Sequence, residues 1–84
     1  MSKHNKTLQR LVATPTPTNI KWDDLVGALK NLGYELLKGD GSRRKFVFPG
    51  TNEVIAVHCP HPQPDVKQYV IRQVAEHLKL HRRI

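Results

Sequence analysis

The chain has 84 residues and a formal net charge of +7, with 14 lysines and arginines against 7 acidic residues. A chain of this length forms one domain at most, and folding buries about two-thirds or less of its surface. No apolar run approaches the roughly 20 residues that span a bilayer, and residues 1–21 lack the continuous apolar stretch of a signal peptide. We therefore expect a cytosolic, cytoplasmic protein with no membrane partner. The single Cys59 cannot form an internal disulfide, which agrees with a reducing compartment.

Positive charge is concentrated in three segments. Residues 1–21 carry +4, residues 37–45 carry +3 and residues 61–84 carry +3, whereas residues 22–36 carry −2. Polyphosphate is a natural partner for such clusters, because each phosphate that is neutralised releases counterions. Nucleic acid is thus one interpretation of the charge, and a surface that only aids solubility is the other.

The first part of the chain is predicted to be a basic arm. A short helix within residues 1–13 would place Leu8, Leu11 and Val12 on one side. Residues 14–18 contain two prolines, which restrict the backbone and predict a short stiff linker. We interpret residues 1–18 as a helical or flexible appendage and residues 19–84 as the folded domain.

A first core helix is expected from residue 22. Apolar side chains recur there at the spacing of one helical face, namely Trp22, Leu25, Val26, Leu29 and Leu32. Asp23 and Asp24 fall in the first turn, where the helix dipole favours negative charge. Gly33 is placed to end the helix in a left-handed conformation.

Three short strands and a second helix follow. The predicted strands are residues 34–38, 44–48 and 53–58, with Phe46 and Phe48 on one face of the middle strand. Turns are expected at residues 39–42 and 49–52. The proline-rich residues 59–64 suit neither helix nor central strand. The last helix is expected over residues 65–78, with one apolar face formed by Val66, Tyr69, Val70, Val74 and Leu78.

The resulting order is α-β-β-β-α, which predicts an α+β domain. Strands joined by tight turns form an antiparallel three-stranded sheet, and two amphipathic helices then cover one of its faces. This is the topology of double-stranded-RNA-binding domains.

The loop from Gly39 to Phe46 is the first candidate site. Its glycines allow close backbone approach, so that loop N–H groups could point at a phosphate, and Ser42 adds a hydroxyl donor. Arginine suits bidentate phosphate binding and stabilises charge on a pentacoordinate phosphorane. In a strand, Arg44 would share the face of Phe46. We predict RNA contacts from Lys38, Gly41, Ser42, Arg43, Arg44 and Lys45. A solvated hairpin whose glycines only serve the turn is the alternative.

The segment around His58, Cys59 and His61 is the second candidate site. Structural zinc requires four ligands, and a second cysteine is missing, so we predict no metal and no other cofactor. A histidine can instead deprotonate a ribose 2′-hydroxyl or protonate a leaving 5′-oxygen. A strand-end histidine and a prolyl loop that only set up the last helix remain equally open.

Trp22 and Tyr69 are aromatic side chains that could stack on bases. Both lie at core spacing on apolar faces, so core packing is the favoured interpretation.

Four motifs in sequence order resemble the HicA toxins. They are the helix end at residues 29–34 (Leu-Lys-Asn-Leu-Gly-Tyr), the Gly-Ser loop at residues 41–46, the strand and His-Pro at residues 57–62, and the last helix at residues 68–74. The similarity extends over residues 22–78, about two-thirds of the sequence.

The resemblance implies a metal-independent ribonuclease (an mRNA interferase) that cleaves mRNA and is held inactive by a HicB antitoxin. It also implies a catalytic histidine two positions after the Gly-Ser pair, and Arg44 stands there in this chain. Arginine is permanently protonated, so it can bind phosphate but cannot act as a base. We therefore predict catalysis by His58, His61 and Arg44. A catalytically silent RNA-binding module, or an interaction protein that only docks an antitoxin, is the alternative.

Overall fold

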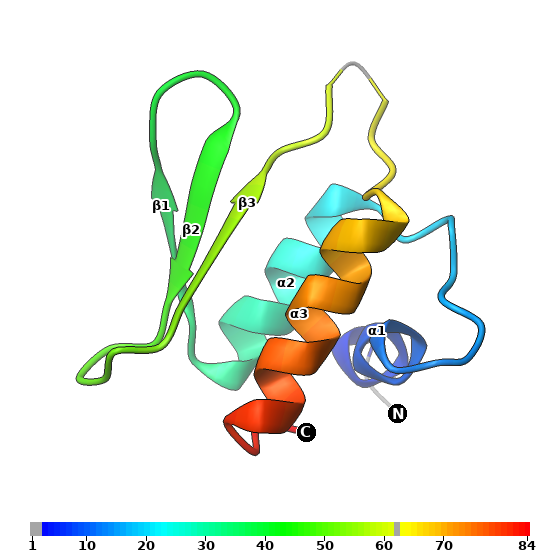
Figure 1. The fold of residues 1–84 in the computed structure, drawn as a ribbon, viewed down its shortest axis with the longest axis horizontal. Helices are drawn as coiled ribbons and strands as arrows, with labels where there is room; N and C mark the ends of the chain where they lie inside the picture. The colour runs from blue at the N-terminus through cyan, green and yellow to red at the C-terminus, as the bar shows by residue number, and fades with distance from the viewer. Residues whose placement is uncertain (1–2, 62) are drawn as a thin grey trace.

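A computed structural model describes residues 3–61 and 63–84. Its elements in chain order are α1 (Lys3–Leu11), α2 (Trp22–Leu32), β1 (Glu35–Lys38), β2 (Arg43–Val47), β3 (Val54–His58) and α3 (Gln68–Leu80), shown in Figure 1. The predicted α-β-β-β-α order is confirmed, with α1 preceding it. Met1 and Ser2 of the predicted arm, and Pro62 of the prolyl segment, lie outside the described residues. None of the described helices combines the length and hydrophobicity that crossing a membrane requires.

The three strands form one antiparallel sheet in the order β1-β2-β3, as predicted. Leu36 pairs with Phe46, and Phe46 pairs with Ile55, so these side chains form one row across the sheet. At the other end of the β2–β3 pairing, Arg43 lies opposite His58. The start of β2 therefore lies beside the end of β3.

The α3 helix begins three residues later than predicted. Asp65 forms a bridge with Lys21, and the Val66 N–H donates to the Ile20 carbonyl at 2.8 Å. Residues 65–67 therefore run extended beside the chain segment that enters α2, and this pairing delays the helix until Gln68. Because it depends on a contact between segments distant in sequence, helical periodicity could not predict it.

Gly33 ends α2 as predicted. Its φ is +115°, and its N–H donates to the Lys30 carbonyl at 3.0 Å. The Tyr34 N–H donates to the Leu29 carbonyl at 3.0 Å. Tyr34 therefore belongs to the helix end rather than to the sheet, which is why β1 begins at Glu35.

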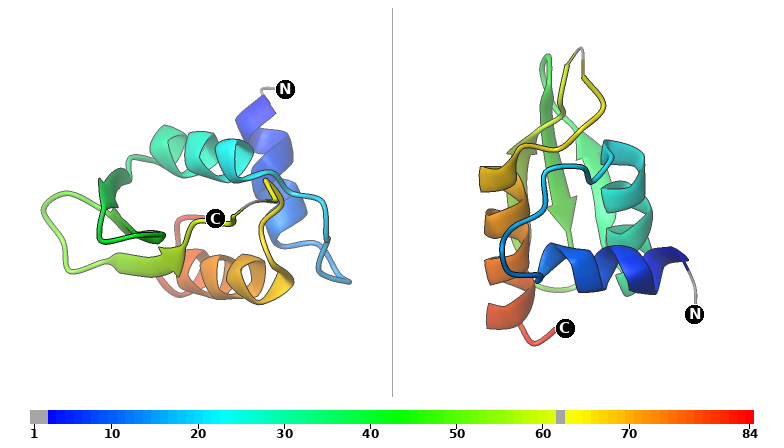
Figure 2. Two further views of the ribbon diagram at one scale, coloured as in Figure 1. Left: turned by 90° about the horizontal axis from the view of Figure 1, so that it is seen from above. Right: turned by 90° about the vertical axis from the view of Figure 1, so that its right-hand side faces the viewer.

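The molecule has three layers, which Figure 2 shows from two sides. The sheet is covered on one face by α2 and α3, as predicted, and α1 crosses these two helices on the side away from the sheet. Phe46 and Ile55 point toward the helices and are buried, whereas Leu37 and Val54 on the opposite face are exposed. One face of the sheet thus builds the core and the other meets solvent.

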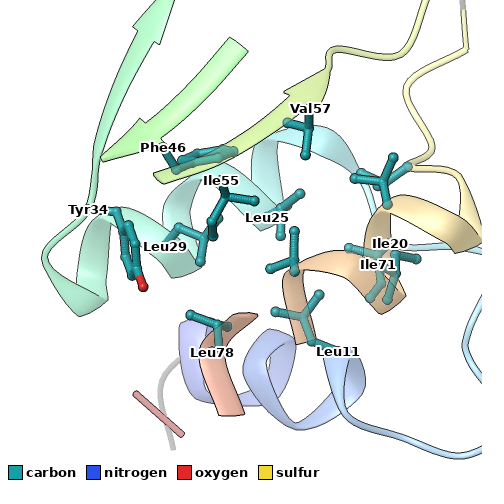
Figure 3. Packing of buried hydrophobic residues seen from close by; sticks show 13 residues of the cluster. Leu11, Ile20, Leu25, Leu29, Tyr34, Phe46, Ile55, Val57, Ile71 and Leu78 are labelled. Carbon is teal, nitrogen blue, oxygen red and sulfur yellow. The ribbon is translucent and has the colours of Figure 1, made fainter. Parts of the chain in front are cut away.

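The core draws on every helix and on the inner face of the sheet (Figure 3). Leu25 and Leu29 of α2 belong to one cluster with Ile71 and Leu78 of α3, and each of these side chains is fully buried. Burying a side chain of this size contributes roughly 1.5–3 kcal/mol. Leu11 of α1 is only 2% exposed and belongs to the same cluster. The α1 helix therefore contributes to the common core, although the division of the chain at residue 18 remains a prediction.

Candidate functional site

The two predicted site segments meet at one end of the molecule. Figure 1 shows the β1–β2 turn and the segment after β3 together at the top, away from the C-terminus. The antiparallel pairing of β2 with β3 places Arg43 opposite His58, and the Cys59 N–H donates to the Ser42 carbonyl at 2.7 Å. The backbone ladder thus holds the Gly-Ser loop against the His-Cys-Pro-His segment.

Both candidate catalytic histidines line one hollow of about 270 Å³. Its lining residues are Ser42, His58, Cys59, Pro60, His61, Lys67, Tyr69 and Val70. The Ser42 Oγ and the His58 Nδ1 lie 3.1 Å apart, within hydrogen-bonding distance. Both histidines are exposed, so a ligand in this hollow has direct access to their rings. The hollow can therefore accept a reacting group and exchange protons with it.

Arg44 lies at a second hollow beside the first. This space, about 400 Å³, is lined by Gly41, Ser42, Arg44, Cys59, Pro60 and His61. The Arg44 Nη1 donates to the carbonyls of Gly41 at 3.0 Å and of Arg43 at 2.8 Å. These bonds hold the side chain over the turn and leave the Nε–Nη2 edge, which suits bidentate contact with a phosphate, outside them. The Arg44 side chain is thus held in place over the turn.

The remaining predicted RNA-contacting cations lie on the hairpin itself. Lys38, Arg43 and Lys45 line a third hollow of about 370 Å³ together with Leu37, Gly39, Asp40 and Arg44. Arg43 and Lys45 are exposed, whereas Arg44 is partly buried on the face of Phe46, as the strand alternation predicts. The basic cluster is therefore divided. Of the three hollows, Lys38, Arg43 and Lys45 line only the one at the hairpin, whereas Arg44 also lines the second hollow, which includes His61.

The turn backbone offers fewer donors to a phosphate than we expected. The Gly39 N–H donates to the Arg43 carbonyl at 2.9 Å, and the Arg43 N–H donates to the Asp40 carbonyl at 3.1 Å. Gly41 adopts a φ of +57° and serves the turn, with nothing within 4 Å of the position of an added Cβ. Because the hairpin uses these two N–H groups itself, a phosphate bound here would depend chiefly on side chains.

Tyr69 differs from its predicted role. It is 52% exposed and lines the hollow that contains His58 and His61. The buried residues of α3 (Val70, Ile71, Val74, Ala75 and Leu78) define a face nearly opposite Tyr69 at 100° per residue. Ile71 and Ala75 were the sequence signal that would have corrected the predicted face. Trp22 does pack on the core as favoured, 5.7 Å from the Phe46 ring.

A second polar cluster surrounds Glu53 at the opposite end of the sheet. Glu53 is only 7% exposed. It accepts hydrogen bonds from the Arg83 Nε at 2.9 Å, from the Arg83 Nη2 and from the Tyr34 hydroxyl at 3.4 Å. These Arg83 hydrogen bonds lower the pKa of Glu53 to about 2. Arg83 also stacks on the Phe48 ring, with 3.6 Å between its Cζ and the ring centroid.

Two histidines adjoin this carboxylate. The His77 Nε2 lies 3.1 Å from the Tyr34 hydroxyl, and burial lowers the pKa of His77. The His81 Nδ1 lies 3.6 Å from Glu53. The potential ligand atoms of Glu53, His77 and His81 lie within 4.8 Å of one another, a grouping that sequence reasoning missed despite the helical spacing of the histidines. Arg83 already pairs with both carboxylate oxygens, so a metal ion would have to displace an internal cation.

The fold defines a small α+β domain with one antiparallel three-stranded sheet. A family model described as HicA toxin of bacterial toxin-antitoxin matches residues 22–80, from the first residue of α2 to the last of α3. The chain belongs to the HicA toxin family. The members of this family are toxins of toxin–antitoxin systems, and membership implies an antitoxin as the kind of partner. Comparisons with curated proteins and with solved structures gave no match.

Proposed function

We propose that this toxin binds mRNA in the cytoplasm and cleaves it without a metal ion, and that a HicB-like antitoxin restrains it. The observation that carries the proposal is the hollow in which Ser42 holds His58, with His61 in the same lining and Arg44 beside it. Family membership and the net charge of +7 add support. The arrangement combines two proton-transfer groups with a fixed cation, which is what cleavage of a phosphodiester requires.

The reaction is attack of a ribose 2′-hydroxyl on the adjacent phosphorus. A neutral histidine removes the 2′-hydroxyl proton as the 2′-oxygen bonds to phosphorus, and a protonated histidine donates a proton to the 5′-oxygen as its bond to phosphorus breaks. The products are a 2′,3′-cyclic phosphate and a 5′-hydroxyl. We assign His58 as the base: in the tautomer whose Nδ1–H donates to the Ser42 Oγ, 3.1 Å away, the lone pair lies on Nε2. His61 is then the acid.

Arg44 binds the reacting phosphate. Its Nε–Nη2 edge contacts two phosphate oxygens and stabilises the charge that develops on them, but it moves no proton. Arg43, Lys38 and Lys45 bind phosphates farther along the strand, because their exposed ammonium and guanidinium groups line the hairpin rather than the histidine-lined hollow. Gly41 and Ser42 complete the contact surface. These residues fix the register of the RNA.

Cleavage and binding of labelled single-stranded RNA in the presence of EDTA test the proposal. We expect wild-type protein to cleave, and a His58→Ala, His61→Ala double variant to bind RNA but lose roughly 10²–10⁴-fold in rate. Gln63→Ala, an exposed change in the same segment, serves as the matched control and should cleave normally. Equal cleavage by the wild type and the double variant would disprove the histidine assignment.

A second candidate function is a catalytically silent RNA-binding module. Arg44 favours it, because this arginine stands where the family resemblance implies a histidine. In the same experiment this module would bind RNA without cleaving it. Absence of both binding and cleavage in the wild type would leave a protein that only docks an acidic antitoxin.

A further inference from the structure

The hollow beside the first turn of α3 is lined by more residues than the proposed proton transfers require. Beyond Ser42 and the two histidines, its wall includes Tyr69, Lys67 and Pro60. Tyr69 is 52% exposed, although it stands in the first turn of a helix whose other large apolar residues near it are buried. An exposed aromatic ring beside an exposed lysine is the surface on which unpaired nucleic acid bases stack.

We propose that this hollow binds one unpaired base next to the cleaved phosphate, with the base stacked on Tyr69 and the neighbouring phosphate near Lys67. The substrate class is therefore single-stranded RNA, although the element order is that of double-stranded-RNA-binding domains. This inference rests on the proposed function, because it assumes that RNA reaches the His58–His61 hollow. It assigns a role to Tyr69, which takes no part in proton transfer. It also predicts that the protein selects single-stranded over double-stranded RNA.

Two physical arguments exclude a duplex from this position. The hollow is recessed and about 270 Å³ in volume, so a base can enter it only after leaving its stack and its pairing partner. In addition, an A-form helix holds the 2′-oxygen to the side of the phosphorus–5′-oxygen bond, whereas the attack requires these atoms to be in line. Stacking a base on Tyr69 would hold the nucleotide outside helical geometry and permit that alignment.

Lys67 and Tyr69 are placed by the late start of α3. The pairing of residues 65 and 66 with the segment before α2 keeps Lys67 extended, as the residue before the first helical turn. Tyr69 follows two residues later and faces the hollow, while Val70 beside it is buried. Lys67, the extended residue before α3, thus forms part of the wall of the hollow.

The test compares binding of one short RNA in two forms, single-stranded and annealed to its complement, by wild-type protein and by Tyr69→Ala, Tyr69→Phe and Leu80→Ala. We expect the wild type to bind the single strand at least tenfold more tightly than the duplex. Tyr69→Ala should weaken single-strand binding roughly 5- to 150-fold, the loss of one base–aromatic stack. Tyr69→Phe keeps the ring and should stay within about twofold of wild type, as should Leu80→Ala, which removes an exposed apolar side chain on the last turn of the same helix.

An abasic nucleotide scanned through the RNA gives an independent measurement. At one position the missing base should weaken wild-type binding as much as Tyr69→Ala does, and the two changes together should cost no more than either alone. Fully additive losses, or equal binding of single strand and duplex by the wild type, would overturn the inference while leaving the proposed function standing. Failure of the wild type to bind any RNA would instead overturn the proposed function, and this inference with it.

Discussion

Polar side chains are buried and paired at one end of the sheet, and they are exposed at the other end. At the end near the C-terminus, the buried Glu53 carboxylate is paired with Arg83 and contacted by Tyr34. At the other end, His58 and His61 are exposed, and the Ser42 Oγ lies within hydrogen-bonding distance of the His58 Nδ1. Buried polar groups need internal partners, because an unpaired one costs the whole of its lost solvation. Groups that bind a ligand must keep donors and acceptors in reserve, so we predict that the buried end stabilises the fold and the exposed end binds the ligand.

The largest effect on activity among these single substitutions should come from replacing Arg44 at the exposed end of the sheet. Arg44→Ala removes the fixed donor edge and should lower kcat by roughly 10²–10³-fold, the usual loss for one group that stabilises developing oxyanion charge. The unfolding midpoint in urea should change little, since among the described residues the side chain bonds only to turn carbonyls. Single-turnover cleavage measures the rate.

Arg72→Ala removes an equal charge from an exposed position on α3 and is the matched control. If both variants lose the same activity, general charge rather than the placement of Arg44 explains the effect. Arg44→Lys should recover only part of the rate, because an ammonium group cannot make the bidentate contact.

The next largest effect should appear in stability, at the buried end. The folded chain holds the pKa of Glu53 at about 2, against an ordinary 4.5. Its contribution to the free energy of unfolding is therefore complete above pH 4.5 and lost as the pH falls toward 2. The pKa of His77 is also lowered, from 6.5, so the unfolded chain takes up that proton first and stability declines as the pH drops below 6.5.

Urea titrations across this range measure both steps. Glu53→Gln should lower stability at neutral pH and remove the acidic step, yet leave RNA binding unchanged. If the Glu53→Gln protein folds normally but binds RNA poorly, RNA binding depends on both ends of the sheet. That result would contradict the separation of roles predicted here. Glu76→Gln, an exposed change on α3, is the control.

The smallest effect should be on the salt dependence of RNA binding. Arg43→Ala and Lys45→Ala should each reduce the slope of log K against log salt by about 0.7 for a single strand, provided each residue neutralises one phosphate. Fluorescence anisotropy between low and moderate salt measures the slope. Lys30→Ala, an exposed change on α2, should leave it unchanged, and an unaltered slope in the hairpin variants would move the RNA surface elsewhere.

Features set by local sequence were predictable. The α2 face, the Gly33 stop and the three strands depend on periodicity and turn residues that lie close together in the chain. The neighbourhood of Arg43 and His58 followed from them, because tight turns join only antiparallel neighbours.

Features set by contacts between distant residues were not predictable. The start of α3 depends on pairing between Val66 and Ile20, which helical periodicity does not reveal. The Glu53–Arg83 pair joins residues 30 positions apart with no periodic signal between them. The sequence predicted an apolar side of a short helix that includes Leu11, but it did not show that this side packs into the common core.

The strand order has a consequence for self-association. Within the described sheet β1 pairs only with β2, so one side of β1 presents backbone N–H and C=O groups to which a strand of another molecule could add. This edge is only four residues long, and Glu35 and Lys38 stand at its two ends. At the opposite edge, the Gln73 side chain donates to the Ala56 carbonyl at 2.9 Å and covers part of β3. A short, charged edge and a capped one both disfavour edge-to-edge aggregation of the protein.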